Sequence, residues 1–148
     1  MLVPPLVLSV AFLYFYPMQK LFFFLLLSFV LFSCKQPTGI KERVIVADSV
    51  AINYFKGDGT MDTVVKVRML RDLQQVNALA GYLENDRVKD VKCGYDGSIH
   101  FFKKGMVLQD ADFRMNDAQC MHFSFVLNGN IYSTQLSAEA KKFLESVK

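Results

Sequence analysis

Two cysteines and two histidines in the second half of the chain carry its most versatile side chains. Cys93 and Cys120 are 27 residues apart, and His100 and His122 follow them by seven and two residues. Thiolate and imidazole are preferred zinc ligands, so a metal- or redox-handling site built from these four residues is one candidate function. Their spacing matches no ligand pattern of the Cys-x-x-Cys type. We therefore expect no metal site, and structural or surface roles for both histidines.

A second candidate cluster consists of oxygen-bearing side chains, namely Asp110, Asp112, Asn116 and Asp117. A calcium loop would need acidic ligands at regular alternate positions, a central glycine and a closing glutamate, and the cluster has none of these. We interpret it as a solvated strand edge followed by a turn. Asp96 lies in a glycine-containing turn, where aspartate is favoured for hydrogen bonds to its local backbone.

No catalytic motif accompanies these residues. The sequence has no Gly-x-Ser-x-Gly elbow, no glycine-rich phosphate loop and no His-Glu-x-x-His helix. The spacing also gives no support to a cysteine nucleophile paired with a histidine. We predict a protein that is not an enzyme and needs no cofactor.

The beginning of the chain predicts export. Lys20 precedes an uncharged, mainly apolar run at 21–32, and Cys34 follows a small residue just after this run. A positive start, an apolar core of about 7–15 residues and a small-residue cleavage site are typical of a secretory signal peptide. The run is too short to span a bilayer, which needs about 20 apolar residues. Residues 1–33 are therefore predicted to be a signal peptide.

The sequence Leu31-Phe32-Ser33-Cys34 resembles the lipobox of bacterial lipoproteins. This resemblance implies that Cys34 receives a diacylglycerol on its sulfur and becomes the new N-terminus after cleavage. Residue 35 is a lysine, so the acidic retention signal of some inner-membrane lipoproteins is absent. The expected location is the cell envelope, with the protein anchored by its lipid to the outer membrane, on its periplasmic or surface face.

Residues 1–17 are apolar and uncharged, and Pro4, Pro5 and Pro17 oppose a continuous helix there. They could form a second membrane segment. We favour a translation start at Met18, with residues 1–17 as a mis-assigned start, because Met-Gln-Lys then forms an ordinary beginning of a signal peptide.

Sixteen basic and fourteen acidic residues follow Cys34, so the mature chain has a net charge of +2. The clustered basic face of a nucleic-acid-binding protein is not indicated. Residues 34–40 contain Pro37 and Gly39 and are expected to form the lipidated cysteine and a short tether. Residues 41–148 are enough for a single domain with one modest core.

Export also bears on the two cysteines of this domain. An exported chain meets an oxidising compartment, where an even number of cysteines favours a disulfide. We predict a bridge between Cys93 and Cys120. Two buried free thiols are the alternative.

Strand and helix patterns follow one another along residues 41–148. Three hairpins and two amphipathic helices are expected, and Asn128-Gly129 is the strongest turn signal. The strands are expected at 44–55, 61–70, 98–102, 106–115, 121–127 and 131–136, and the helices begin at Asp72 and Ser137. The order ββα-ββββα predicts an α+β fold, in which an antiparallel sheet of about six strands carries both helices on one face.

The other face of such a sheet would be free to bind a partner. Phe101 and Phe102 are neighbours in a predicted strand, so their side chains point to opposite faces, and one must lie off the main core. Together with Tyr95, Phe101 or Phe102 is therefore a candidate contact residue.

Two short stretches of the domain resemble small bacterial lipoproteins of Gram-negative envelopes, a group without an established activity. They are Cys93-Gly94-Tyr95-Asp96-Gly97 and His122-Phe123-Ser124-Phe125 followed by Asn128-Gly129. The resemblance implies a role for Cys34 alone. We expect a lipid-anchored envelope protein that contacts the membrane through its lipid and binds an envelope protein or a small ligand. A periplasmic metal- or redox-handling domain that uses the two cysteines and two histidines is the alternative.

Overall fold

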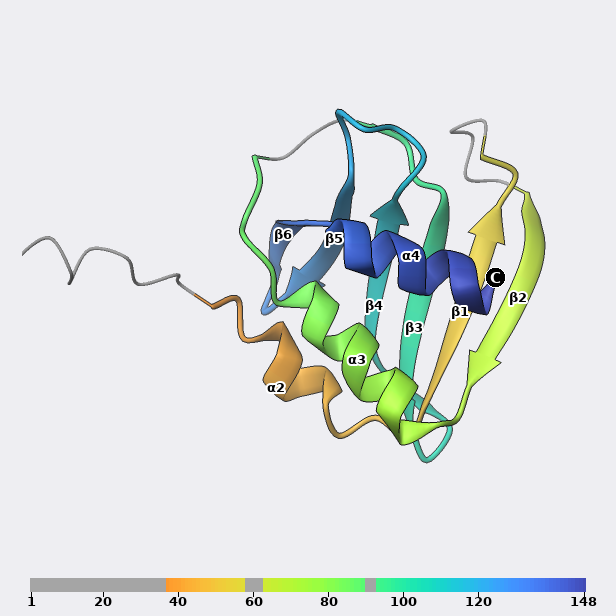
Figure 1. Cartoon of the computed structure of the whole chain (residues 1–148). Coiled ribbons are helices and arrows are strands. Elements are labelled where there is room, and N and C mark those ends of the chain that lie inside the picture. Colours follow the sequence, from red (N-terminus) through yellow and green to blue (C-terminus); the bar gives the residue numbers. More distant parts are fainter. Residues whose placement is uncertain (1–36, 58–62, 90–92) are drawn as a thin grey trace, which may run out of the picture. The chain divides into compact units, whose positions relative to one another are not determined.

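A six-stranded antiparallel sheet with helices on one face forms the body of the structure (Figure 1). The computed structural model describes residues 37–57, 63–89 and 93–148, so the expected signal peptide, Cys34 and the first residues of the tether lie outside the described residues. The elements are α2 (Ile40–Val44), β1 (Ser49–Phe55), β2 (Val64–Leu70), α3 (Leu73–Leu83), β3 (Gly97–Lys103), β4 (Met106–Arg114), β5 (His122–Leu127), β6 (Asn130–Gln135) and α4 (Ala138–Val147).

The strand order across the sheet is β2-β1-β3-β4-β5-β6, and every neighbouring pair is antiparallel. The predicted α+β fold and its order ββα-ββββα are confirmed. One short helix, α2, precedes this order and was not predicted. No helix among the described residues is long and apolar enough to cross a membrane.

Two of the hairpins turn through residues with left-handed backbones. Lys104 and Gly105 have φ values of 50° and 78°, and Asn128 and Gly129 have φ values of 52° and 78°. Two successive residues with positive φ match the twist of the flanking strands, which is why Asn-Gly favours hairpins. The hairpin predicted around Asn128-Gly129 is thus confirmed as β5–β6.

The β3–β4 hairpin contains a one-residue bulge. Phe102 lies opposite Val107, but Phe101 lies opposite Gln109, so Leu108 is an extra residue in β4. Residues beyond the bulge are displaced by one position relative to a regular hairpin. Because side chains alternate between the faces of a strand, this displacement decides which residues of β4 face which residues of β3.

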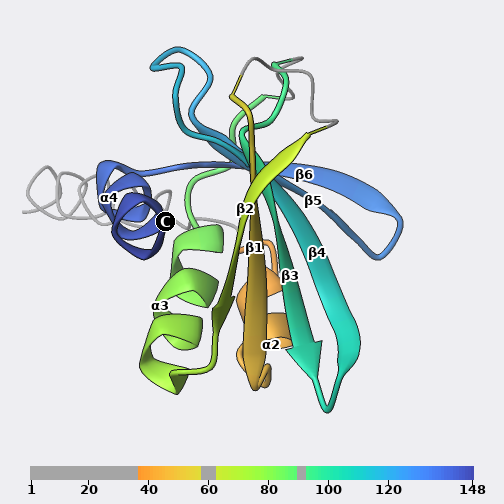
Figure 2. The ribbon, with the colours of Figure 1, turned by 90° about the vertical axis from the view of Figure 1, so that its right-hand side faces the viewer.

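Helices α3 and α4 cover one face of the sheet, and the opposite face, called the helix-free face below, carries neither of them (Figure 2). On the covered face, Val50, Ile52 and Tyr54 of β1 are fully buried. The hydroxyl of Tyr54 donates a hydrogen bond of 2.7 Å to the carbonyl oxygen of Leu144 in α4. Burial raises the pKa of Tyr54 to about 12, so this phenol stays neutral and holds α4 to the sheet.

Helix α2 is attached to the domain by the carboxylate of Glu84, at the end of α3. Glu84 accepts hydrogen bonds from the backbone nitrogens of Thr38 and Lys41 and from the Thr38 hydroxyl. Burial acts to raise the pKa of Glu84, but these hydrogen bonds outweigh it and lower the pKa, so the carboxylate stays charged. Ile40 is fully buried. The predicted tether of residues 34–40 was therefore too long, because the chain is fixed to the domain from Thr38 onwards.

The two edges of the sheet differ. The backbone nitrogen of Val88 donates to the carbonyl oxygen of Ser133 at 2.9 Å, and that of Gln135 donates to the carbonyl oxygen of Asp86 at 2.8 Å. Residues 86–88 thus cover the outer edge of β6 along its second half, Ser133–Gln135. Strand β2 lies at the other end of the strand order and pairs with β1 alone.

Gly97 occupies a position with no room for a side chain. A Cβ atom there would lie 2.3 Å from the carbonyl oxygen of Asn53 and 2.3 Å from Cζ of Phe113. We expect Gly97→Ala to lower the free energy of unfolding by about 1–3 kcal/mol, the usual cost of overpacking. In α3 a Cβ on Gly81 would meet nothing within 4 Å. Gly81→Ala should therefore raise the free energy of unfolding by up to about 1 kcal/mol, because alanine has the higher helix propensity. Urea unfolding of both variants checks this, and equal effects would contradict it.

Candidate functional site

A row of polar side chains crosses the helix-free face of the sheet. The pairing register places them side by side, one on each strand from β1 through β3, β4 and β5 to β6: Asn53, Ser98, Asp112, Ser124 and Ser133. The three serines are each less than a tenth exposed. Since buried polar groups normally have hydrogen-bond partners, the pairing within this row indicates where a partner is missing.

His100 lies at the centre of a hydrogen-bonded network beside this row. Its Nδ1 lies 2.6 Å from Oδ1 of Asp110, and its Nε2 lies 3.0 Å from both Nδ2 of Asn53 and Oγ of Ser98. The Asn53 amide nitrogen can only donate, so Nε2 accepts and the imidazole proton sits on Nδ1, facing Asp110. The network fixes both the orientation and the tautomer of His100.

Ser98, His100 and Asp110 share the hydrogen-bond connectivity of a serine hydrolase triad. Two features oppose that chemistry. Ser98 is only 8 % exposed, and the Asn53 amide also donates to its hydroxyl. In addition, β3 pairs with strands on both sides, so its ladder uses the backbone N–H groups that could have formed an oxyanion hole. The network orients His100 and leaves Ser98 unsuited to act as a nucleophile.

Asp112 is half-buried, and its side-chain carboxylate forms no hydrogen bond or ion pair with any described residue. Burial raises the pKa of Asp112; His100 lowers it in part and Asp110 raises it further. A carboxylate that is desolvated without a partner destabilises the folded protein in its charged form. Asp112 is therefore the one charged member of the polar row, and its charge has no partner among the described residues. Oγ of Ser133, in the same row, is buried without a hydrogen-bond partner.

Replacing Asp112 by asparagine should stabilise the protein at neutral pH. The pKa of Asp112 is higher in the folded than in the unfolded state, so the free energy of unfolding falls as the pH rises through this window. Asp112→Asn removes the charge that causes this fall. We therefore expect the free energy of unfolding of the variant to be higher by about 0.5 kcal/mol at pH 7. The gain should disappear below the ordinary carboxyl pKa of 3.8. Urea unfolding at pH 7 and pH ~3 measures both, and a variant that is less stable at pH 7 would contradict the prediction.

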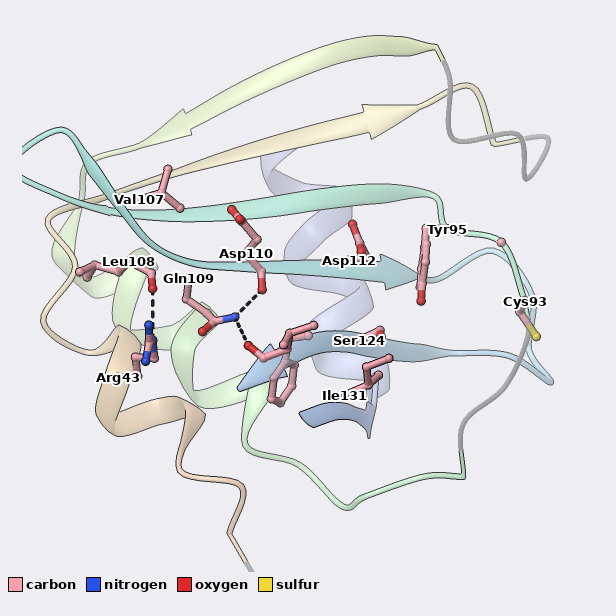
Figure 3. Close-up of a pocket in the computed structure, with 13 residues that line it drawn as sticks. Arg43, Cys93, Tyr95, Val107, Leu108, Gln109, Asp110, Asp112, Ser124 and Ile131 are labelled. Atoms are coloured by element: carbon pink, nitrogen blue, oxygen red, sulfur yellow. Dashed lines mark hydrogen bonds between the residues drawn. The ribbon is translucent and has the colours of Figure 1, made fainter. Parts of the chain in front are cut away.

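A pocket of about 850 Å³ lies over β4, β5 and β6 on the helix-free face, and Asp112 and Ser124 belong to its wall (Figure 3). Arg43 and Tyr95 lie at its opposite ends, with Asp112 between them. Three exposed apolar side chains complete it, namely Val107, Val126 and Ile131. Sites for small molecules typically measure about 300–1,000 Å³, so the pocket has the size of a small-ligand site.

No family model, curated protein or solved structure matches this chain. The site is therefore interpreted from its own geometry.

The end of the pocket nearest Tyr95 is held by a disulfide. Cys93 and Cys120 form the predicted bridge, with their Cα atoms 6.3 Å apart. The ring of Tyr95 contacts that of His122, with 5.7 Å between the ring centroids. The bridge thus fixes the segment that carries Tyr95 against the start of β5.

The four residues of the candidate metal or redox site are not brought together. The two sulfurs are bonded to each other and offer no thiolate to a metal. His100 lies opposite Asp110, whereas His122 lies opposite Arg114, four residues further along β4. Within the described ranges, no three His, Cys, Asp or Glu side chains are placed to hold a metal ion.

His122 was expected to have a structural or surface role. It does lie on the helix-free face, but Tyr95 covers it and it is only 1 % exposed. Its Nδ1 lies 2.6 Å from the carbonyl oxygen of Cys120, and its Nε2 is buried without a partner. Its role in the described structure is to pack under Tyr95.

Of the adjacent phenylalanines, Phe102 is the one that lies off the core. Phe101 is fully buried on the helix-covered face, so of the two alternatives Phe101 is excluded as a contact residue. Phe102 is half-buried on the opposite face and does not line the pocket. Tyr95 does line the pocket, so it is the only one of the three candidate contact residues in its wall.

Asp96 is not part of a local turn motif, contrary to the sequence interpretation. Its carboxylate is almost fully buried and forms a 2.9 Å ion pair with Nη1 of Arg114. It also accepts hydrogen bonds of 2.8 Å from the backbone nitrogens of Met115 and Asn116. Asp96 therefore ties the start of β3 to the end of β4.

The two aspartates that matter most for the site were not predicted to belong to it. Asp110 and Asp112 were interpreted as a solvated strand edge, but β4 is an interior strand of the sheet. Their spacing of two residues was the available signal, because it places both on the same face of a strand. Their contact with the residues of β3 could not be derived, since it depends on the bulge at Leu108.

Proposed function

We propose that this chain is an exported, lipid-anchored envelope protein whose domain binds a small ligand in the pocket on the helix-free face. The observation that carries the binding proposal is the pocket itself, which combines apolar walls with a few convergent polar groups. The anchoring proposal rests on the predicted signal peptide and on Cys34, which occupies the cysteine position of a lipobox.

The attachment of Thr38 to Glu84 bears on this proposal. Only three residues separate Cys34 from Thr38, and an extended chain advances by at most about 3.6 Å per residue. If Cys34 is lipidated, the first fixed residue of the domain lies within about 14 Å of it. The proposed ligand would then be one that reaches a domain held close to the membrane surface.

Anchoring is tested by the intact mass of the detergent-extracted protein. We expect an N-terminus at Cys34 that carries acyl chains, and for Cys34→Ser an unmodified precursor without them. An unprocessed leader in the unaltered chain would overturn the anchoring proposal.

Binding is tested by native mass spectrometry of the chain after incubation with small molecules extracted from cell envelopes. We expect a bound small mass that is lost in Val126→Trp, because this exposed side chain lies in the pocket wall. Val67→Trp is the matched control, since Val67 is equally exposed on β2 but lies outside the pocket. A bound mass that both variants keep, or that neither the unaltered chain nor the variants retain, would overturn the binding proposal.

A further inference from the structure

We propose that the pocket binds an organic cation, with an ammonium group beside Asp112 and Ser124 and an apolar body against Val126 and Ile131. This inference rests on the proposed binding function and adds the chemical class of the ligand. It is carried by two unpartnered polar groups in the pocket wall, by the charge of that wall and by its apolar side (Figure 3).

The first group is the carboxylate of Asp112. It is half-buried, and no described residue donates a hydrogen bond to it or forms an ion pair with it. Asp110, two residues away on the same face, already has a partner in His100. A ligand ammonium would supply the charge and the hydrogen bonds that Asp112 lacks, and such charge-assisted bonds are roughly twice as strong as neutral ones.

The second group is the hydroxyl of Ser124, which lies directly across from Asp112 on β5. Ser124 is only 7 % exposed, and its hydroxyl has no hydrogen-bond partner among the described residues. It lines the pocket. Its oxygen is not enclosed by the protein, so the molecule that fills the pocket can supply its hydrogen-bond partner. An ammonium has three donors and can serve Asp112 and Ser124 together.

The charged groups of the wall favour a cation over an anion. The charged residues that line the pocket are Asp110, Asp112 and Arg43, so the wall carries an excess of one negative charge. The Nε atom of Arg43 already donates to the carbonyl oxygen of Leu108 at 3.2 Å. The guanidinium keeps its positive charge, but Arg43 is exposed at one end of the pocket. Asp112 is half-buried between Arg43 and Tyr95, and its carboxylate has no partner among the described residues.

The apolar side of the pocket favours an organic cation over a metal ion. Val126 and Ile131 are paired across β5 and β6, and more than half of each side chain is exposed. Covering such surfaces is favourable at about 25 cal/mol per Å². In the part of the chain that the structure describes, no third carboxylate or imidazole joins the two aspartates to form a metal site.

The test compares three probes that share a phenyl ring and a short chain: 2-phenylethylammonium, 2-phenylethanol and phenylacetate. Each is measured at pH 7 by equilibrium dialysis against the full chain in lipid nanodiscs, with empty nanodiscs as the blank. We expect the ammonium to bind at least tenfold more tightly than the alcohol or the carboxylate. Its affinity should also fall with added salt.

Two variants test whether the ammonium group contacts Asp112. Asp112→Asn should weaken binding of the ammonium at least tenfold while leaving the affinity for the alcohol unchanged, and this variant is expected to fold because the unpaired charge is removed. Asp117→Asn, outside the pocket, should change neither affinity. An ammonium affinity that Asp112→Asn does not alter would overturn the proposed contact.

The remaining outcomes separate the two proposals. Equal binding of all three probes, lost in Val126→Trp, would overturn the cation assignment and leave the binding function standing. If no probe binds but a neutral or anionic molecule from the envelope extract does, the cation assignment fails alone. If no probe binds and the extract yields no bound mass, both proposals fail.

Discussion

Replacing Asp96 by asparagine should lower the free energy of unfolding by about 3–5 kcal/mol, the usual loss when one partner of a buried ion pair is removed. The side chains of Asp96 and Arg114 are 1 % and 17 % exposed, so water cannot replace the lost carboxylate. Both carboxylate oxygens of Asp96 accept hydrogen bonds, from two backbone N–H groups and from Arg114. In asparagine an NH₂ group replaces one of these oxygens, so its hydrogens would meet N–H donors. Chemical unfolding of the purified variant measures the loss.

Asp117→Asn is the control for this prediction. Asp117 accepts one backbone hydrogen bond, from Gln119, in a partly exposed turn, so its replacement should cost about 1 kcal/mol or less. If Asp96→Asn and Asp117→Asn cost the same, Asp96 does not stabilise the junction between β3 and β4 in the way its contacts indicate.

Removing the disulfide should have a comparably large effect. Cys93 and Cys120 are 27 residues apart in the sequence. Closing a loop of this length stabilises by about 3.5 kcal/mol when the unfolded chain is treated as a flexible polymer. We expect the Cys93→Ser/Cys120→Ser double variant to unfold at a correspondingly lower urea concentration. Reduction of the unaltered protein should produce a similar shift.

The same reductant should leave the double variant unchanged, which separates the effect of the bridge from other effects of the reagent. A reduced protein as stable as the oxidised one would show that the bridge adds nothing to stability. Because the bridge fixes the segment that carries Tyr95, its removal should also weaken binding in the pocket.

Local chemistry made most of the fold predictable. Asp72 accepts a hydrogen bond from the backbone nitrogen of Gln74, and Ser137 accepts one from that of Ala140, so both helices begin at the expected residues. The hairpins likewise follow from their turns. Helix α2 could not be predicted in this way, because it has only five residues and is held by Glu84, more than forty residues away in the sequence.

The candidate site was less predictable than the fold, since it depends on register. Counting outward from the turn at Lys104 without a bulge would place Gln109 opposite His100. The extra residue at Leu108 places Asp110 there instead, and it brings Asp112 into the polar row. Nothing in the local sequence around Leu108 predicts a bulge. A single extra residue there shifts all later residues of β4 by one position and so changes which side chains meet on this face.

The covered edge of β6 limits how copies of this domain could assemble. Open sheet edges are where chains join into fibres, because each added strand offers a new edge to the next. Here residues 86–88 already pair with the Ser133–Gln135 half of one edge, and among the described strands β2 is the edge strand without such cover. Two chains joined through β2 would therefore expose a covered β6 at each end. Growth by strand addition beyond such a pair would be hindered at β6, which favours a closed pair over a fibre.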